Sequence, residues 1–137
     1  YTGLIWPTGR SYVTAGFHDP DYPFRRSLGE HSGVDIRASQ GTTIKAAANG
    51  YVARVKFDGT KNYAYIMIIH GDGLSTVYGH VSAVNVKADQ YVAQGQNIGR
   101  TGGLPGSVGS GPFCTGAHLH FEVRKNGLPV DPLDYLP

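Results

Sequence analysis

The residues of this chain best suited to chemistry are two histidines, His118 and His120, which lie within the segment TGAHLHFEV at 115–123. The β-branched and aromatic residues around them favour a strand. Successive side chains of a strand point to opposite faces, so both imidazoles lie on one face and Leu119 lies on the other. Imidazole binds metal ions and transfers protons near neutral pH. The pair therefore predicts a metal site or a proton-transfer site on one face of a sheet.

A second candidate pair, His31 and Asp35, is four residues apart with Gly33 between them. Gly33 disfavours a helix, and residues i and i+4 of an extended segment also share a face. Imidazole nitrogen and carboxylate oxygen are both zinc ligands, and a catalytic zinc site typically has three protein ligands and a water. We expect His31, Asp35 and one of the two strand histidines to hold one zinc ion per chain. The spacing does not decide between His118 and His120.

A further candidate, His80, follows Tyr78 and Gly79 at the end of an expected strand. Zinc lowers the pKa of a bound water to about 7. A histidine that does not bind the metal could take the proton of this water and return it to a leaving amine. The residue types together predict metal-assisted hydrolysis.

Structural roles are the alternatives for several of these residues. His80 could end a strand with its ring hydrogen-bonded to the backbone, and the two strand histidines could face solvent. Glu122 shares the face of His120 and could either support that residue or lie in solvent. Cys114 lies four residues before His118, but a lone thiol is more often packed than bound to metal.

The elements that position these residues are expected to be short strands. The chain of 137 residues suits one domain, and its 20 glycines and 8 prolines favour many turns. We expect two strands within 42–57 about an Asn49-Gly50 turn, because Asn-Gly tolerates the positive φ that a hairpin needs. Further strands are expected at 63–70, 74–80, 84–92, 97–100 and 118–125, the last followed by an Asn126-Gly127 turn. No helix of three turns is expected, which predicts an all-β sheet core or sandwich.

One domain over 1–137 is expected to have three parts. Residues 1–30 form an irregular N-terminal segment and groove loop, 31–125 form the catalytic β core, and 126–137 form a C-terminal tail. The chain begins at Tyr1 without Met or a signal peptide, so we expect a processed fragment, with a possible regulatory segment or partner outside it.

Composition excludes several classes of function. The net charge is only +2 and the basic residues are scattered, which does not fit a nucleic-acid-binding surface. No apolar run approaches the roughly 20 residues that span a bilayer. Cys114 is the single cysteine, so no internal disulfide can form.

The motifs together resemble the lysostaphin-type (β-lytic) zinc metallopeptidases, a family of peptidoglycan endopeptidases. The resemblance covers about residues 6–132 and rests on HSGVD at 31–35, ANGYV at 48–52, YGH at 78–80, VAQGQNIGRTG at 92–102 and TGAHLHFEVR at 115–124. It implies an antiparallel β-sheet with an open groove bounded by loops. It also implies that His31, Asp35 and His120 bind zinc, while His118 and His80 activate the water or stabilise the oxyanion.

The function implied by the resemblance is zinc-dependent hydrolysis of amide bonds in peptidoglycan stem peptides or cross-bridges, in an extracytoplasmic bacterial compartment. The long loop at 102–116 leaves the choice of bond open, because loops carry substrate choice. A non-catalytic module that binds cell wall or a division partner is the main alternative. A biotin or lipoyl carrier is a weaker one, because Lys61 lacks the flanking strand pattern of a carrier lysine.

Overall fold

The computed structural model describes residues 3–9, 13–18, 32–111 and 116–137. Strands make up almost all of the regular structure in these residues, and one short 3-10 helix, η1 (Pro132–Asp134), follows the last strand. The strands are β1 (Val13–Ala15), β2 (Val34–Arg37), β3 (Thr43–Lys45), β4 (Gly50–Lys56), β5 (Tyr65–Gly71), β6 (Leu74–Gly79), β7 (Val81–Val84), β8 (Tyr91–Val92), β9 (Asn97–Thr101), β10 (His118–Lys125) and β11 (Leu128–Val130). The all-β class expected from the sequence is confirmed.

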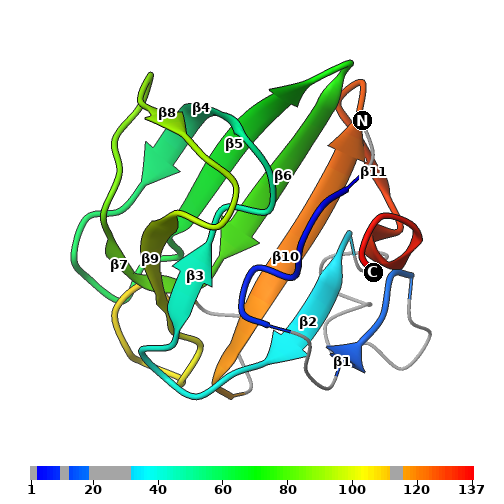
Figure 1. Ribbon diagram of the computed structural model, residues 1–137. Coiled ribbons are helices and arrows are strands. Elements are labelled where there is room, and N and C mark those ends of the chain that lie inside the picture. Colours follow the sequence, from blue (N-terminus) through cyan, green and yellow to red (C-terminus); the bar gives the residue numbers. More distant parts are fainter. Residues whose placement is uncertain (1–2, 10–12, 19–31, 112–115) are drawn as a thin grey trace.

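The strands of the described residues form two antiparallel sheets (Figure 1). The large eight-stranded sheet has the order β1-β2-β10-β6-β5-β4-β8, with β11 paired to β10, and the small three-stranded sheet has the order β3-β9-β7. In Figure 1 the small sheet lies over the part of the large sheet that contains β4, β5 and β6. The two sheets are in contact, because a Cβ on Gly99 of β9 would lie 3.5 Å from Ile66 of β5.

The hydrophobic core lies on the face of the large sheet that the small sheet covers. In β10, Leu119, Phe121 and Val123 are completely buried in this core. The residues that alternate with them, His118, His120 and Glu122, therefore point to the opposite face. Burial on both faces keeps β10 rigid at the centre of the sheet and fixes its register, because a slip of one residue would exchange the two sets of side chains.

The expected Asn126-Gly127 turn is confirmed, and a second turn, at Asp72-Gly73, has the same backbone conformation. Asn126 and Gly127 have φ values of 52° and 82° and connect β10 to β11. Asp72 and Gly73 have φ values of 52° and 76° and connect β5 to β6. Asn, Asp and Gly are the residues that adopt these left-handed conformations at the lowest cost.

The Asn49-Gly50 hairpin expected within 42–57 is wrong. The two strands on either side of this pair, β3 and β4, belong to different sheets, where β3 pairs with β9 and β4 pairs with β5 and β8. The buried residues Ala46, Ala47 and Ala48 carry the chain from one sheet to the other. Asn49 instead accepts a hydrogen bond on its side-chain oxygen from the backbone N–H of Gln94, at 2.7 Å.

Two smaller expectations also need correction. The single strand expected at 84–92 is divided into the end of β7 and the two residues of β8, with loop between them. The irregular segment expected at 1–30 contains β1, which extends the edge of the large sheet by pairing with β2. Residues 19–31, which include the expected ligand His31, lie outside the described residues.

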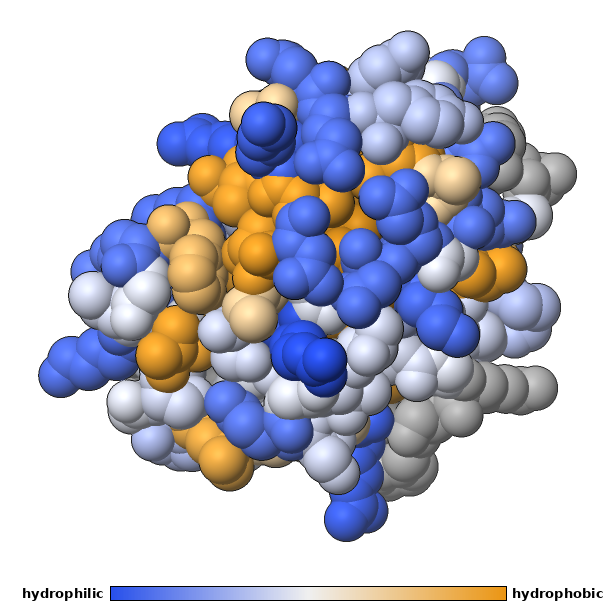
Figure 2. Space-filling model, turned by 60° about the vertical axis from the view of Figure 1, so that its left-hand side comes forward, coloured by the Kyte–Doolittle hydropathy of each residue, from blue (hydrophilic) through white to orange (hydrophobic). Residues whose placement is uncertain are grey.

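The surface is mixed in polarity. Figure 2 shows one face of the molecule, on which apolar residues gather in a central area with hydrophilic side chains around and over it. Within the described residues, no helix is long and apolar enough to cross a membrane.

Candidate functional site

The candidate site is built on the face of the large sheet opposite the core, where β2, β10 and β6 run side by side. His120 of β10 pairs in register with Asp35 of β2 on one side and with Gly79 of β6 on the other. His118 pairs in the same way with Arg37 of β2. Three neighbouring strands thus bring together residues that are far apart in the sequence.

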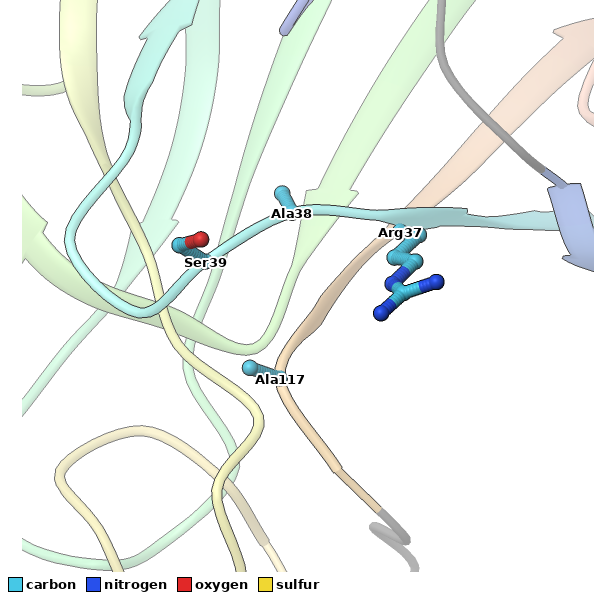
Figure 3. A pocket seen from close by; sticks show the side chains of 4 residues that line it. All are labelled: Arg37, Ala38, Ser39 and Ala117. Atoms are coloured by element: carbon cyan, nitrogen blue, oxygen red, sulfur yellow. The ribbon is translucent and has the colours of Figure 1, made fainter.

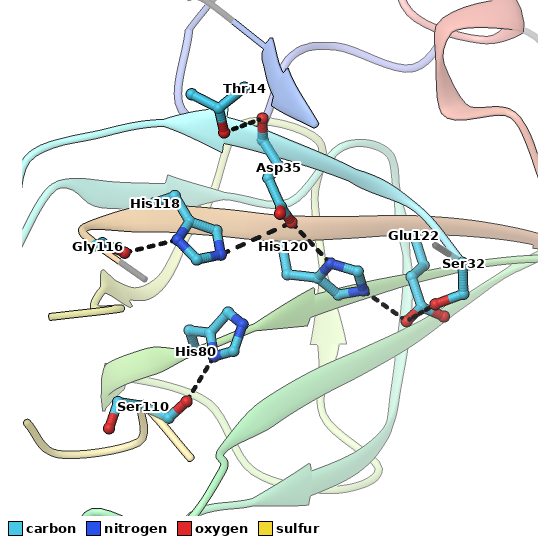
Figure 4. Close-up of polar contacts among 9 residues, drawn as sticks. All are labelled: Thr14, Ser32, Asp35, His80, Ser110, Gly116, His118, His120 and Glu122. Carbon is cyan, nitrogen blue, oxygen red and sulfur yellow. Dashed lines mark hydrogen bonds and ion pairs between the residues drawn. The ribbon is translucent and has the colours of Figure 1, made fainter. Parts of the chain in front are cut away.

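Asp35 and the two strand histidines converge on one point (Figure 4). His120 Nδ1 lies 2.9 Å from Asp35 Oδ1, and His118 Nε2 lies 3.7 Å from the same oxygen. All three side chains are largely buried, since 10–14 % of their side-chain surface is exposed. The carboxylate of Asp35 and the imidazole of His120, held at this distance on a rigid sheet, are two converging donors of the types that zinc prefers.

His118 has a defined tautomer in this arrangement. Its Nδ1 lies 2.6 Å from the carbonyl oxygen of Gly116, and a carbonyl oxygen only accepts hydrogen bonds. Nδ1 therefore carries a proton, and Nε2 points toward Asp35. This geometry suits a proton acceptor beside the carboxylate.

His80 closes the other side of the cluster. It follows β6 with a left-handed φ of 62°, and its Nδ1 donates to the carbonyl oxygen of Ser110 at 2.8 Å. Its ring lies 4.8 Å from the ring of His118 and 6.1 Å from that of His120. Burial, together with the nearby His118 and His120, lowers the pKa of His80 to about 4, so its Nε2 is unprotonated at neutral pH.

A second row of polar side chains fixes the ring of His120. Its Nε2 donates to Glu122 Oε2 at 2.8 Å, and the same carboxylate oxygen accepts a hydrogen bond from Ser32 Oγ at 3.0 Å (Figure 4). The other oxygen, Oε1, accepts from Nε and Nη2 of Arg124, at 3.0 and 2.8 Å. Glu122 is thus buried, and both of its carboxylate oxygens are hydrogen-bonded. The alternative prediction, that Glu122 lies in solvent, is wrong.

These contacts determine the protonation of the pair. Burial alone would raise the pKa of Glu122, but the hydrogen bond and charge of His120 and Arg124 outweigh it and lower that pKa to about 2. Burial alone would also lower the pKa of His120, but its hydrogen bonds to Asp35 and Glu122 outweigh it and raise that pKa to about 9. The ring is therefore held between two carboxylates, one at each nitrogen.

Glycine at two positions allows the close packing around the cluster. A Cβ on Gly79 would collide with the hydroxyl of Tyr63 and lie 3.2 Å from Cβ of His120. A Cβ on Gly33 would collide with the carbonyl oxygen of Phe121. Tyr63, whose pKa is raised by burial and then by the charges of Glu122 and Asp35, therefore lies against β6 and β10 beside the histidines.

Cavities adjoin the cluster on this face. One of about 540 Å³ is lined by Arg37, Ala38, Ser39 and Ala117, at the end of β2 and the start of β10 (Figure 3). In Figure 3 the Arg37 side chain extends from the end of β2 toward the open side. Arg37 pairs in register with His118, so this cavity begins directly beside the cluster.

The site residues expected from the sequence fall into two groups. The structure brings together Asp35, His80, His118 and His120, whereas His31 and also Cys114 lie outside the described residues. Among the residues that are described, no group of three His, Cys, Asp or Glu side chains has the geometry of a complete metal site. Asp35 and His120 provide two converging donors, and a third ligand is still needed.

The family is decided by the match of the chain to known sequences. The sequence model of peptidase family M23 matches residues 29–132, which contain all of the candidate residues. The chain belongs to peptidase family M23. The lysostaphin-type resemblance read from the motifs is thereby confirmed.

Relatives of this M23 domain include proteins that are named as peptidases. It is 39% identical over 131 residues to the DD-carboxypeptidase/endopeptidase Mpg of Neisseria meningitidis, which covers 94% of this chain and 28% of the relative. The crystal structure of a zinc-containing peptidase from Vibrio cholerae has a TM-score of 0.76 at 29% identity, over 92% of this chain and 37% of that one. The antimicrobial peptidase lysostaphin from Staphylococcus simulans has a TM-score of 0.74 at 30% identity, over 92% of this chain and 50% of that one. The M23 domain thus spans less than a third of the length of Mpg.

Two residues of the site, Ser32 and Arg124, were not identified from the sequence, which for Tyr63 left open whether it packs in the core or lines the groove. The alternation His118, His120, Glu122, Arg124 along one strand could have indicated that Arg124 shares the face of the site. Ser32 lies between His31 and Gly33 and offers no separate signal. Tyr63 reaches the site only because Gly79 lacks a side chain, and no motif records that contact.

Proposed function

We propose that this M23 domain is a zinc-dependent endopeptidase that hydrolyses amide bonds in the stem peptides or cross-bridges of bacterial peptidoglycan. The observation that carries the proposal is the convergence of Asp35 Oδ1 and His120 Nδ1, with Nε2 of His118 directed at the same carboxylate. Membership of a peptidase family and the similarity to Mpg and lysostaphin support peptide hydrolysis. Because peptidoglycan lies outside the cytoplasmic membrane, the proposed location is extracytoplasmic.

In this proposal Asp35, His120 and His31 hold one zinc ion per chain. The donor types fit zinc, and the contact between Asp35 Oδ1 and His120 Nδ1 is the one that a shared cation would replace. When bound, zinc supplies a Lewis acid that acidifies water and stabilises negative charge on the substrate oxygen. The hydrogen bond from His120 Nε2 to Glu122 orients the ring so that Nδ1 faces Asp35.

The proposed role of His118 and His80 is proton transfer. Hydrogen bonds to the carbonyl oxygens of Gly116 and Ser110 fix Nδ1–H in both rings, so Nε2 is the nitrogen with which each ring would accept a proton. One histidine takes a proton from the attacking water as the new C–O bond forms. The proton is then delivered to the amine nitrogen as the amide C–N bond breaks. The low pKa of His80 keeps its ring neutral at neutral pH, so Nε2 retains the lone pair with which it would accept a proton.

Digestion of purified sacculi tests the proposal. The zinc-loaded protein is expected to release soluble muropeptides, and mass spectrometry of the products identifies the bond that is cut. The chelator o-phenanthroline and the substitution His31→Ala are each expected to stop release. Metal analysis should find about one zinc per chain. A protein that binds sacculi without zinc and releases nothing would instead be a non-catalytic wall-binding module.

A further inference from the structure

A smaller cavity of about 260 Å³ lies on the same sheet face as the histidine cluster and serves none of the steps described above. Its lining residues come from the four strands at the centre of the large sheet and from the segment before β5. They are Arg54, Tyr63, Tyr65, Met67, Val77, Glu122 and Arg124. All of these positions belong to the described residues.

The strand register places this cavity directly beside the cluster. Glu122 of β10 pairs with Val77 of β6, Val77 pairs with Met67 of β5, and Met67 pairs with Arg54 of β4. This row of side chains crosses the sheet next to the row that contains His120 and Gly79. Residues two apart on one strand face are separated by about 7 Å. An extended peptide advances about 3.5 Å per residue, so a substrate residue one to three positions from the cut bond reaches the cavity.

The charge of the cavity is positive. The single carboxylate in the lining, Glu122, is already hydrogen-bonded to Arg124, to Ser32 and to His120. The Arg54 guanidinium carbon lies 6.0 Å from the centroid of the Tyr65 ring, and among the described residues no carboxylate forms an ion pair with Arg54. The cavity thus has a second, exposed guanidinium whose charge is not neutralised by any acid among the described residues.

We infer that this cavity binds a free carboxylate of the peptide substrate, with Arg54 as the residue that recognises it. The inference rests on the proposed function and adds a substrate preference to it. A guanidinium forms two parallel hydrogen bonds with a carboxylate, whereas a neutral carboxamide offers one acceptor oxygen and no charge. Met67 and Val77 form the apolar floor against which the aliphatic part of that substrate residue packs. The M23 domain therefore prefers a stem peptide with a free acid near the cut bond over its amidated form.

Met67 provides a direct probe, because it is the single methionine of the chain. With 13C-labelled methionine, one methyl signal reports on the cavity. Zinc-depleted protein is titrated with two synthetic stem peptides that differ only by a free carboxylate or a primary carboxamide beside the scissile position. The acid peptide is expected to shift the Met67 methyl signal with about threefold to tenfold higher affinity than the amide.

Arg54→Gln tests the residue, and Lys56→Gln is the matched control. Both side chains are exposed, two residues apart on the same face of β4, and each substitution removes one positive charge, but Lys56 does not line the cavity. Arg54→Gln is expected to remove the preference for the acid peptide, and Lys56→Gln to keep it. Equal affinity of the wild type for the two peptides, or equal effects of the two substitutions, would overturn the inference.

The same peptide pair separates this inference from the proposed function. With zinc-loaded protein, the ratio of kcat/KM for acid over amide peptide is expected to fall about threefold to tenfold in Arg54→Gln, while zinc content stays the same. Loss of all cleavage in the wild type, with the binding preference intact, would contradict the endopeptidase and leave the carboxylate site standing. Cleavage of both peptides at equal rates, without a binding preference, would contradict the carboxylate site alone.

Discussion

The substitution Glu122→Gln tests whether the second row of polar side chains holds His120 ready for a metal ion. The two oxygens of Glu122 accept hydrogen bonds from His120 and Ser32 on one side and from Arg124 on the other. Glutamine is the same size but has one acceptor oxygen and one NH2 group. In either orientation, its NH2 group faces the N–H donors of His120 or those of Arg124, and one hydrogen bond to that side is lost. The substitution also removes the negative charge that supports His120 through Nε2.

Loss of a carboxylate that supports a metal-binding histidine typically weakens metal binding by 10- to 100-fold, which corresponds to about 1.4–2.7 kcal/mol. We expect Glu122→Gln to fall in this range, because Glu122 makes its contact with His120 in a buried site at 2.8 Å. Ser32→Ala removes only one of the hydrogen bonds to Glu122 and is expected to have a smaller effect in the same direction.

Zinc affinity is measured by competition with a fluorescent chelator at neutral pH, and the urea unfolding of the zinc-depleted proteins is followed in parallel. Asp72→Asn is the control, because Asp72 is exposed in the β5–β6 turn and its φ of 52° also suits Asn. It is expected to bind zinc like the wild type. A dissociation constant of Glu122→Gln within about twofold of the wild type would refute the reasoning that Glu122 orients His120.

Three further predictions concern the cluster itself. His120→Ala is expected to lose both bound zinc and activity, whereas His118→Ala is expected to keep zinc and lose activity. Loss of zinc from both variants would show that the division of roles between His120 as ligand and His118 as proton acceptor is wrong. Gly79→Ala forces a Cβ against the Tyr63 hydroxyl and should lower the free energy of unfolding by about 1–3 kcal/mol, measured in urea. In the folded protein the pKa of His80 is lowered from 6.5 to about 4. As the pH falls, His80 is therefore protonated in the unfolded chain before it is protonated in the folded one. The zinc-depleted protein should lose up to about 3 kcal/mol of stability between pH 6.5 and pH 4. His80→Gln should lose less over the same range, and an equal loss would argue against a buried neutral ring.

The sequence predicted most of the site because strand alternation is a local rule. The spacing of His118, His120 and Glu122 is enough to put all three on one face of a strand, and the structure has them there. Asp35 joins them because β2 pairs with β10, which spacing alone does not reveal. The resemblance to a known family supplied that long-range pairing.

The failures of prediction come from tertiary packing. Asn49-Gly50 has the local chemistry of a hairpin turn, but the buried alanines before it are used to pass between two sheets. The contact of Tyr63 with the site depends on the missing side chain of Gly79, on another strand. Neither relationship has a signature within a short window of sequence, because each joins residues that meet only in the folded protein.

The central position of β10 has a consequence for how this domain can be made. β10 pairs with β2 on one side and with β6 on the other, yet it follows both of them in the chain by dozens of residues. A chain that has been synthesised only as far as β9 therefore has two unpaired strand edges, which are the features that promote association between chains. We expect such an intermediate to depend on rapid completion or on chaperones. The same order means that Asp35, His80 and the two histidines of β10 come together only after the last long strand has entered the sheet.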